Sequence, residues 1–480
     1  MSKKIVNIEI SNELEFAKLR SNYGNMAEGY IGDLANKKLA EILNSANTEE
    51  IYDIKGTKYY VSQNGDDAND GLSPEKAIKS LDRIDSLELK FGDAVLFERG
   101  SVFRFARVLM AKEGVIYGSY SEGMKPAIYG SPENYALSCE WSSVKPNIWQ
   151  LPFPYKRASG IVLDYGMIIG IQKADIDSLK ENGDYYHDFE NGVFYLYCDN
   201  GNPKDTYQSV EIMPAFNLIT IKDYGDVIVD NLCLKYCGGF AISALDTKPN
   251  ITVTNCEIGF IGGLWFNENL RFGNAIEFWA GLPNVRIENI KVNNCWFYQV
   301  YDTALSWQGN QQDTVWKNID FSGNLFEYNN ADIEFWCVDG CRLEEFKMNN
   351  NIMRFTSMGW GTRTNDGGIR GIEGCVRGIT GTKNSQLKTF EAEYIDNYMD
   401  CPARQIISWN IRPEYKEKII ARGSKIFVKS EYRTLDACLQ GLQEDLETEP
   451  YDFRIPAKNK QELEEIFTRF EDGAEIHWDE

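Results

Sequence analysis

The sequence contains very little histidine, which limits the chemistry that the protein can perform. Only His187 and His477 occur among its 480 residues. A Ser-His or Cys-His nucleophile needs an imidazole base beside it, so two widely separated histidines argue against that class of enzyme. The sequence also lacks a Gly-x-Ser-x-Gly elbow and a glycine-rich phosphate loop ending in Lys-Ser/Thr. These absences argue against elbow-type serine hydrolases and phosphate-loop nucleotide enzymes.

Basic residues are also in short supply. The 50 lysines and arginines are outnumbered by 72 aspartates and glutamates, which gives a formal net charge of −22. A field of this sign repels phosphate backbones, so no nucleic-acid partner is expected. The same repulsion disfavours a polyanionic glycan, and a carbohydrate partner would more readily be neutral.

Long apolar runs are missing as well. No stretch of about 20 apolar residues occurs, so no membrane span is predicted. Residues 1–10 carry no secretory signal either. We therefore expect a cytoplasmic protein if Met1 is the natural start, and a secreted protein if the natural chain was trimmed there.

The cysteines lack the pattern of a disulfide framework. There are eleven, an odd number, spread along the chain. Cys233, Cys256 and Cys295 fall in predicted core strands and are interpreted as small buried apolar residues, which is typical of a reducing compartment. Cys337 and Cys341 could ligate zinc, but no second ligand pair with zinc-finger spacing lies nearby. No cofactor is therefore predicted, and calcium is left open.

What the sequence does contain is a repeat of short β-rich runs. Residues 1–56 carry apolar residues at helical spacing and predict an N-terminal helical segment. Over residues 57–411, β-rich runs alternate with Gly, Asn and Asp. Residues 412–480 are charged and predict a C-terminal cap or extension. Within the repeat, successive β-runs end in an asparagine, and these anchors are Asn231, Asn255, Asn294, Asn324, Asn351 and Asn397.

The spacing of the anchors, roughly 24 to 46 residues, indicates a stacked solenoid. A single coil cannot bury its inward side chains, so coils stack and neighbouring strands pair about 4.8 Å apart. Asparagine suits the bends because it tolerates left-handed torsions, and stacked amides can bond from coil to coil. The predicted fold is all-β, a single-stranded right-handed parallel β-helix.

Several N-terminal stretches carry a family resemblance. Residues 58–74, followed by residues 77–81, are similar to an opening strand, an Asp/Gly loop and a cap helix with Ser73 as its predicted N-cap. Residues 92–103 and 116–130 are similar to first coils. On these stretches the chain resembles the pectate-lyase-like superfamily of carbohydrate-active, right-handed parallel β-helix proteins.

The resemblance extends over about residues 57–411 and implies a carbohydrate substrate. The stretch from Asp184 to Tyr197 resembles a small β-insertion of glycoside-hydrolase members, and we expect an insertion near residues 160–212. The reaction stays open, because this fold hosts lyases, hydrolases, epimerases, phage tailspikes and adhesins.

Three segments repeat one motif closely: Asn274-Ala-Ile-Glu-Phe-Trp279, Asp302-Thr-Ala-Leu-Ser-Trp307 and Ala331-Asp-Ile-Glu-Phe-Trp336. Aligned on their tryptophans, they predict equivalent strands of three successive coils, with side chains alternating between the two faces. The alignment predicts inward Ile276, Ala304 and Ile333, an outward column of Glu277, Leu305 and Glu334, and a second outward column of Trp279, Trp307 and Trp336. The tryptophans would then form a platform for pyranose rings, unless a loop covers them and they only pack.

The carboxylates of these segments are the candidate catalytic groups. Glu277 and Glu334 lie two coils apart in this alignment, roughly 9.6 Å between backbones, and an inverting glycosidase separates its carboxyls by about 6.5–9.5 Å. Asp302 and Asp332 belong to adjacent coils and could approach within about 5 Å, where repulsion would raise one pKa and supply a general acid. We hypothesise that two of these four act as acid and base. The alternatives are a solvated acidic surface and a calcium site of convergent carboxylates.

Three further residues complete the candidate substrate-binding set. Gln308 follows the second tryptophan, Arg271 precedes the first motif, and Arg363 comes from the next coil. In the family that the chain resembles, lyase members use Lys or Arg as the base together with calcium. No lysine lies in the three aligned strands, which disfavours a lyase, while Arg363 keeps that possibility open.

The sequence therefore predicts a glycoside hydrolase that acts on a neutral or mildly charged poly- or oligosaccharide with inversion. A polysaccharide lyase on the same fold is one alternative. A non-catalytic glycan-binding or structural β-helix is another, and trimerisation would favour it. The sequence leaves open the sugar, its linkage and the oligomeric state.

Overall fold

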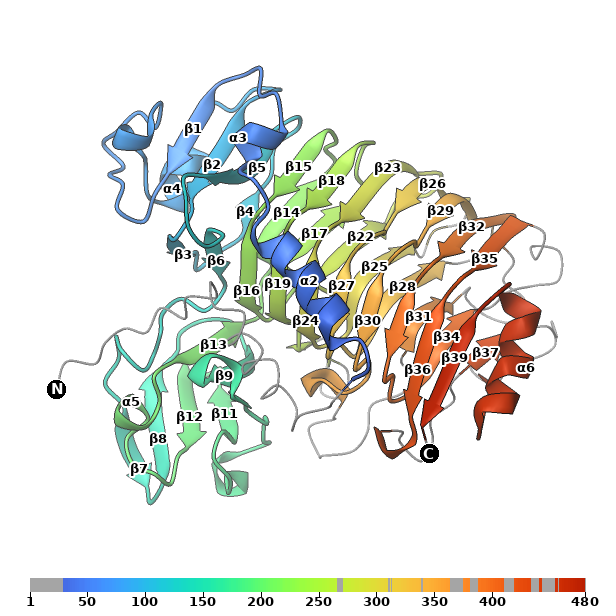
Figure 1. Cartoon of the computed structure of the whole chain (residues 1–480). Coiled ribbons are helices and arrows are strands. Elements are labelled where there is room, and N and C mark those ends of the chain that lie inside the picture. The colour runs from blue at the N-terminus through green and yellow to red at the C-terminus, as the bar shows by residue number, and fades with distance from the viewer. Residues whose placement is uncertain are drawn as a thin grey trace.

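The structure is a computed structural model. It describes residues 29–265, 271–309, 311, 313–337, 340–362, 374–379, 387–409, 418–432, 440–442, 454–455 and 457–479. Within these residues, three long sheets run along the molecule and only a few short helices accompany them (Figure 1).

We call the three long sheets A, B and C. In spatial order, sheet A contains β1 (Lys58–Val61), β2 (Ala94–Glu98), β5 (Ile116–Tyr120), β15 (Val227–Asp230), β18 (Ile251–Thr254), β23 (Arg286–Asn293), β26 (Val315–Asp320), β29 (Arg342–Lys347), β32 (Thr389–Ile395) and β35 (Ile419–Arg422). Sheet B contains β3 (Val102–Arg104), β6 (Ala127–Tyr129), β16 (Cys233–Cys237), β19 (Glu257–Ile261), β24 (Trp296–Val300), β27 (Leu325–Glu327), β30 (Ile352–Arg354), β33 (Tyr398–Asp400), β36 (Lys425–Lys429) and β39 (Glu475–Asp479). Sheet C contains β4 (Leu109–Met110), β14 (Ile219–Lys222), β17 (Ile242–Leu245), β22 (Ile276–Ala280), β25 (Thr303–Gly309), β28 (Ala331–Cys337), β31 (Gly374–Ile379), β34 (Gln405–Trp409), β37 (Gln440–Leu442) and β38 (Arg454–Ile455).

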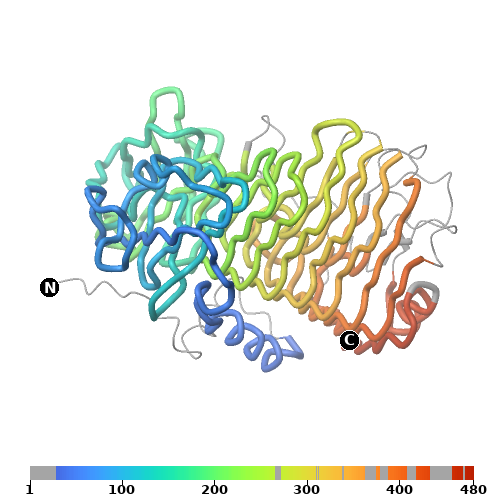
Figure 2. Tube along the Cα trace, turned by 90° about the horizontal axis from the view of Figure 1, so that it is seen from above, coloured from blue at the N-terminus to red at the C-terminus, as the bar shows by residue number. Residues whose placement is uncertain are grey.

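Each coil passes through sheets A, B and C in turn. Strands β26, β27 and β28 form one coil, for example, and each pairs in parallel with its counterpart among β29, β30 and β31 in the next coil. Figure 2 shows the coils stacked in a row from the N-terminal to the C-terminal part of the chain. Because parallel connections of this kind are right-handed in nearly all proteins, the fold is the right-handed parallel β-helix that the sequence predicted.

Stacked apolar side chains fill the inside of the solenoid. In sheet C, Ile242, Ile276, Leu305, Ile333 and Val376 pair in register and are all fully buried. Burying one such side chain stabilises the fold by about 1.5–3 kcal/mol, and stacking like residues lets each coil bury the open end of the previous one. This requirement explains the β-branched and aliphatic runs that recur along the sequence.

Asparagines form the predicted corners between sheets A and B. Asn231, Asn255 and Asn294 have φ values of 63°, 53° and 51°, the left-handed conformation that asparagine tolerates better than most residues. Their amides bond from coil to coil, since Asn294 Nδ2 donates to Asn255 Oδ1 at 2.6 Å.

In the later coils the left-handed position moves one residue earlier, to Gly323 and Asn350. The anchors Asn324, Asn351 and Asn397 are buried there instead. The backbone N–H of Asn324 donates to Asn351 Oδ1, and that of Asn351 to Asn397 Oδ1, each at 3.0 Å. The anchors therefore serve the same corner in two different ways.

The described part of the N-terminal segment lies along the outside of sheet B (Figures 1 and 2). It contains α2 (Gly32–Leu43) and α3 (Thr48–Ile51). The buried residues of α2, Ala35, Leu39 and Ile42, follow helical spacing and join a cluster with aromatic residues of sheet B. Residues 12–28, part of the predicted helical segment, lie outside the described residues.

Both ends of the α2 segment are fixed to the solenoid. The backbone N–H of Tyr30 donates to Asp400 Oδ1 at 2.9 Å, and Ser45 Oγ donates to Asn231 Oδ1 at 3.0 Å. These contacts reach from the coil that contains β33 back to the coil that contains β15. The segment therefore spans several coils and ties them together.

The sequence suggested that the insertion begins near residue 160, but its first strand begins earlier. Its strands are β7 (Ser142–Lys145), β8 (Ile148–Pro152), β9 (Ala158–Leu163), β10 (Ile168–Ile169), β11 (Tyr185–Asp188), β12 (Val193–Tyr197) and β13 (Val210–Pro214), with α5 (Pro203–Thr206) before the last strand. They form two antiparallel sheets with an apolar cluster of their own. The earlier strands were missed because β7 is exposed throughout and has no apolar alternation.

The β-helix continues beyond residue 411, which the sequence predicted as its end. Strands β35 and β36 pair with β32 and β33, and β39 pairs with β36. Helix α6 (Lys460–Phe470) precedes β39, and its Leu463, Ile466 and Phe467 join the main core. The charged composition of this part reflects exposed faces of coils as well as the end of the solenoid.

The N-terminal end of the solenoid carries the 3-10 turn η1 (Pro74–Lys76) and the helix α4 (Leu81–Asp85). The N-cap of α4 is Ser80, whose Oγ accepts from the backbone N–H of Arg83, whereas Ser73 makes no such bond. Strands β20 (Leu264–Trp265) and β21 (Arg271–Phe272) form a small antiparallel pair beside the solenoid. In the described part of the chain, no helix is long and apolar enough to cross a membrane.

Candidate active site

The outer face of sheet B is closed by α2. Buried ion pairs lie beneath this helix: Arg354 joins Glu327 and Asp400, each at 2.8 Å, and Lys235 pairs with Glu257. Every charge in this group has a partner of opposite sign. The face therefore packs the helix and offers little open surface for a ligand.

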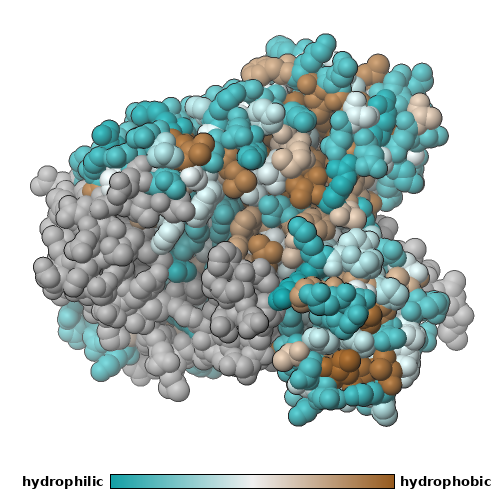
Figure 3. Space-filling model, turned by 180° about the vertical axis from the view of Figure 1, so that it is seen from behind, coloured by the Kyte–Doolittle hydropathy of each residue, from teal (hydrophilic) through white to brown (hydrophobic). Residues whose placement is uncertain are grey.

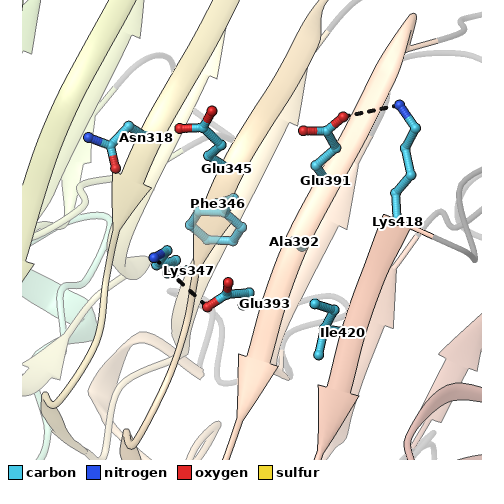
Figure 4. A pocket seen from close by; sticks show the side chains of 9 residues that line it. All are labelled: Asn318, Glu345, Phe346, Lys347, Glu391, Ala392, Glu393, Lys418 and Ile420. Carbon is cyan, nitrogen blue, oxygen red and sulfur yellow. Dashed lines mark hydrogen bonds and ion pairs between the residues drawn. The ribbon is translucent and has the colours of Figure 1, made fainter.

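The outer face of sheet A carries rows of paired charges. A shallow pocket of about 380 Å³ lies over β29, β32 and β35 (Figure 4). Its lining residues are Asn318, Glu345, Phe346, Lys347, Glu391, Ala392, Glu393, Lys418 and Ile420. Two ion pairs cross it, Lys418–Glu391 at 3.1 Å and Lys347–Glu393 at 4.0 Å, and their side chains are partly exposed to solvent. Such surface pairs are typical of a solvated face.

Seen from behind, much of the described surface is hydrophilic, and apolar surface appears at the upper right, near the centre and over the insertion at the lower right (Figure 3). The exposed apolar residues of the insertion are Leu137, Val144, Met167, Ile171 and Phe189. They carry no ionisable group that could catalyse a reaction. The carboxylates that the sequence singled out lie in sheet C.

The register of sheet C differs from the predicted alignment in its middle strand. Glu277 pairs with Ser306, and Ser306 pairs with Glu334, which in turn pairs with Arg377. The sequence alignment had put Leu305 at the middle position. The observed outward column is therefore Glu277, Ser306, Glu334 and Arg377, and we call it the carboxylate column.

The same one-residue shift corrects the predicted tryptophan ladder. Trp307 pairs with Phe278 and Phe335, is 0 % exposed, and belongs to the main core. Gln308 takes its place in the outward column, between Trp279 and Trp336. The rings of Trp279 and Trp336 are half-buried and nearly parallel, with centroids 6.4 Å apart. The predicted platform would therefore consist of two tryptophans with an amide between them.

Glu277 is a buried carboxyl whose hydrogen-bond partner is a neutral amide. It is 8 % exposed, and Asn274 Nδ2 donates to its Oε2 at 2.7 Å. Burial raises the pKa of Glu277 to about 8, the nearby carboxylates of Glu334 and Asp302 add to the rise, and the Asn274 hydrogen bond opposes it. Glu277 is therefore protonated at neutral pH.

Glu334 is buried among cationic and polar donors instead. Arg377 approaches its Oε1 at 3.3 Å. Its Oε2 accepts hydrogen bonds from Ser306 Oγ at 3.1 Å, Gln308 Nε2 at 3.0 Å and Thr303 Oγ1 at 3.4 Å. Donors of this kind stabilise an ionised carboxylate. Two carboxyls of one column thus have opposite environments.

Asp302 and Asp332, which the sequence predicted to approach each other, are not register partners. Thr303 pairs with Ala331, so the register sets Asp302 beside Asn330 and not beside Asp332. Asp332 is 0 % exposed and accepts hydrogen bonds from Thr356 Oγ1 and Asn329 Nδ2. Burial raises the pKa of Asp332 to about 7. This carboxyl lies close to Cys375 of the main core, where burial and then the Asp332 charge raise the pKa of the thiol, and it is not part of the carboxylate column.

Asp302 lies near the column without belonging to it. It is half-buried at the start of the β25 strand, and its charge contributes to the raised pKa of Glu277. The prediction failed because it aligned the three segments on their tryptophans. The register instead sets Leu305 beside Ile276 and Ile333, so the middle segment is shifted by one residue and its side chains change faces.

Asn274 is a functional candidate that the sequence pattern did not single out. Its Oδ1 accepts from the backbone N–H of Thr303 at 3.0 Å, and its Nδ2 donates to Glu277. A backbone N–H can only donate, so the orientation of the amide is fixed and its N–H must face the carboxyl. Its place three residues before Glu277 gave no hint of this role, because the orientation of the amide is set by Thr303 of the next coil.

Two predicted binding residues lie partly or wholly outside the described residues. Arg271 lies in β21, where its backbone pairs with Trp265, and its side chain lies outside what the structure describes. Arg363 lies outside the described residues altogether. Arg377, which the sequence reasoning missed, is the arginine that meets Glu334. It was missed because the coil that brings it there is 43 residues long, counted from Glu334 to its register partner.

The structure also shows the surroundings of His187 and of the cysteine pair Cys337 and Cys341. His187 is buried in the insertion, where its Nδ1 accepts from the backbone N–H of Ala158, and burial lowers its pKa. Cys337 and Cys341 are buried thiols that form no disulfide. Within the described residues, no group of three or more His, Cys, Asp or Glu side chains is arranged to hold a metal ion.

Comparisons with known proteins find likeness only among solved structures. No family model matches the sequence, and no curated protein matches it. The chain is similar to a GH136 lacto-N-biosidase from Eubacterium ramulus, with a TM-score of 0.38 and 12 % identity over 90 % of this chain and 69 % of that one. It is also similar to a protein described as a glycoside hydrolase (TM-score 0.41, 11 % identity, 88 % and 96 %) and to a rhamnogalacturonan lyase (0.38, 10 %, 78 % and 74 %). At scores this low, the fold is assigned from the strand topology and the function is inferred from the residues of sheet C.

Proposed function

We propose that the protein is a glycoside hydrolase in which Glu277 is the general acid and Glu334 the general base. The observation that carries this proposal is the opposite environment of two carboxyls in one column. Glu277 is buried with a pKa raised to about 8, and Glu334 is surrounded by Arg377 and three hydrogen-bond donors. One protonated and one ionised carboxyl are what hydrolysis of a glycosidic bond requires.

In the proposed reaction, Glu277 donates its proton to the glycosidic oxygen as the bond from that oxygen to the anomeric carbon breaks. Glu334 accepts a proton from a water molecule on the other side of the ring, and the water oxygen bonds to the anomeric carbon. The products are a free alcohol and a hemiacetal of inverted configuration. Two strand spacings, roughly 9.6 Å between backbones, suit this arrangement after the side chains lean inward.

The substrate is proposed to be a neutral oligo- or polysaccharide. The net charge of −22 disfavours a polyanion. Trp279 and Trp336 offer ring faces beside the carboxylate column, and Gln308 Nε2 bonds Ser306 Oγ at 2.7 Å as well as Glu334. Aromatic faces with a few fixed polar groups are typical of sites that bind sugars and other small ligands.

The test is hydrolysis of aryl-glycosides and of neutral xylo-, cello- and chito-oligosaccharides, with product anomers followed by NMR. We expect turnover by the wild type, loss of turnover in Glu277→Gln and Glu334→Gln, and an inverted product. Asp302→Asn tests whether the charge beside Glu277 affects turnover. Asp332→Asn is the control, because it changes a carboxyl outside the column. Full turnover in either glutamine variant would rule out this mechanism. Binding without any turnover would indicate a glycan-binding β-helix.

One observation favours a lyase as the second candidate. Arg377 brings a cation to the carboxylate column, where the sequence offered no lysine. A lyase of the family that the chain resembles would use such a base with calcium on a uronic-acid glycan. Activity on polygalacturonate that gives unsaturated products and is abolished by a calcium chelator would support this reading over hydrolysis.

A further inference from the structure

Gln405 is a buried amide without a partner. It is 1 % exposed, and neither its Oε1 nor its Nε2 has a hydrogen-bond partner among the residues that the structure describes. A buried polar group of this kind costs about 1–3 kcal/mol. Native proteins keep such groups rarely, and a ligand or a bound water usually satisfies them.

The register sets Gln405 on the same outward column as two residues that bind the catalytic carboxyls. Gln405 pairs with Gly374, which lies on the strand next to that of Glu334. Thr303 and Ala331 belong to the same column and pair with each other on the two preceding strands. Asn274 extends this column by one coil, beside Thr303. Asn274 donates to Glu277, and Thr303 Oγ1 donates to Glu334. The column therefore faces the carboxylates, three residues before them on each strand.

Between Thr303 and Gln405 this column has no large side chain. Its two intermediate positions are Ala331 and Gly374. A Cβ atom at residue 374 would lie 2.6 Å from the Gln405 carbonyl oxygen and 2.8 Å from its Cβ, so only glycine allows the two strands to keep this contact. The polar column is thus interrupted by small residues, with the free amide at the far side of the interruption.

We propose that Gln405 is a substrate-binding residue that holds hydroxyl groups of a sugar unit beyond the cleaved bond. The inference deepens the proposed glycosidase function and rests on it. Gln405 is two strands from the strand of Glu334, roughly 9.6 Å along the solenoid, so the sugar it meets is a neighbour of the one that reacts.

The chemistry of the amide defines the ligand. Its N–H donates and its C=O accepts, which matches two adjacent sugar hydroxyls, each both donor and acceptor. The amide carries no charge and gives a carboxylate no advantage, in agreement with a neutral glycan. A site built to bond hydroxyls also discriminates strongly against a sugar that lacks them.

The experiment compares Gln405→Met with the wild type on disaccharides and tetrasaccharides of the xylo-, cello- and chito-series. Affinity is measured by calorimetry in the Glu277→Gln background, and KM and kcat are measured in the active protein. We expect the Kd and the KM for the bound tetrasaccharide to rise about tenfold, which corresponds to one lost hydrogen-bonded contact. The rise for the corresponding disaccharide should be smaller. The melting temperature should stay the same or increase, because a free buried amide has been removed.

Gln405→Leu repeats the test if the methionine variant folds poorly, and Gln63→Met in an exposed N-terminal loop is the matched control. An equal loss of affinity for short and long glycans, or no loss of affinity, would overturn the inference. The amide of Gln405 would then bind only water. A wild type that binds none of the tetrasaccharides would overturn it too. Failure of the proposed reaction has a different signature, since Glu277→Gln would then retain turnover whatever Gln405 does.

Discussion

Sheets B and C both bury charged groups on their outer faces, yet they treat these groups in opposite ways. Under α2, Arg354 holds Glu327 and Asp400, and Lys235 holds Glu257. On sheet C, Glu277 is bonded by a neutral amide and stays protonated. A fully paired buried charge is a packing element, whereas a carboxyl kept neutral by burial is ready to give up a proton. Under the proposed function, this difference separates structural from reactive acids in one solenoid.

The largest effect that would test this comparison is loss of the proposed acid. Glu277→Gln should lower kcat/KM by about 10²–10⁴-fold, the usual contribution of a general acid. Unfolding should not become easier, because glutamine is as neutral as the protonated glutamate it replaces. The two measurements are the rate on the best substrate of the panel and the melting temperature. A variant that keeps its rate and loses stability would make Glu277 a structural residue like those under α2.

The matching change on sheet B should affect stability. Arg354→Met leaves the buried carboxylates Glu327 and Asp400 without their cation, and we expect unfolding to become easier by about 3–5 kcal/mol. Chemical denaturation measures this directly. Arg342→Met, at an exposed position of sheet A, is the control and should change the unfolding free energy by less than about 0.5 kcal/mol. If both variants behave alike, the ion pairs under α2 contribute little.

A third pair of variants tests the register of sheet C. Trp307→Ala removes a fully buried core ring and should cost about 3–5 kcal/mol of unfolding free energy. Trp336→Ala, at a half-buried outward position, should cost less but weaken glycan binding. Denaturation and calorimetry together distinguish the two. Equal losses of stability would favour the original alignment, in which both rings share one face.

The pH dependence separates the two buried acids of sheet C. The folded-state pKa values of Glu277 and Asp332, about 8 and about 7, lie above their ordinary values of 4.5 and 3.8. Raised values mean that the folded protein binds more protons than the unfolded chain between these limits. Stability should therefore be greatest below about pH 4 as far as these groups are concerned, and decline as pH rises to about 8.

Activity should follow Glu277 alone. The rate should fall as pH increases through about 8, when the general acid loses its proton. Asp332→Asn should weaken the pH dependence of stability and leave the alkaline limb of the rate in place. Loss of the alkaline limb in Asp332→Asn would show that Asp332, and not Glu277, titrates in that limb.

The smallest expected effect concerns the residue that orients Glu277. Asn274→Leu removes a hydrogen bond that lowers the pKa of Glu277, so the alkaline limb of the rate should move to higher pH. The backbone N–H of Thr303 also loses its acceptor, and we expect a cost of about 1–3 kcal/mol in unfolding free energy. A lower rate with an unmoved limb would mean that Asn274 is only a structural contact.

The fold could be predicted because its requirements recur in every coil. A corner that needs left-handed torsion admits few residue types, so Asn231, Asn255 and Asn294 mark successive coils in the sequence. The inward aliphatic columns repeat for the same reason. The end of the solenoid and the start of the insertion were predicted less well, because exposed strands such as β7 and β35 carry no strong pattern.

The site was predicted only in part, because it depends on register. Glu277 and Glu334 do share a column, and the intervening residue was wrong by one position. The three tryptophans suggested equivalence, but Trp307 is equivalent to Phe278 by packing. A shift of one residue moves a side chain to the other face, and tryptophan at the same place in each segment did not mark the same position of the strand. Asn274, Arg377 and Gln405 could not be recognised before the coils were stacked.

The α2 segment also constrains the order in which the protein can be made. The backbone N–H of Tyr30 binds Asp400, which follows it by 370 residues. Synthesis proceeds from the N-terminus, so the residues that leave the ribosome early must wait for a coil that is translated much later. Earlier coils can stack as they emerge, in the manner of other repeat proteins, while the face of sheet B remains uncovered. The helix translated before every coil is thus among the last elements to dock, and its docking joins the separately stacked coils into one cooperative unit.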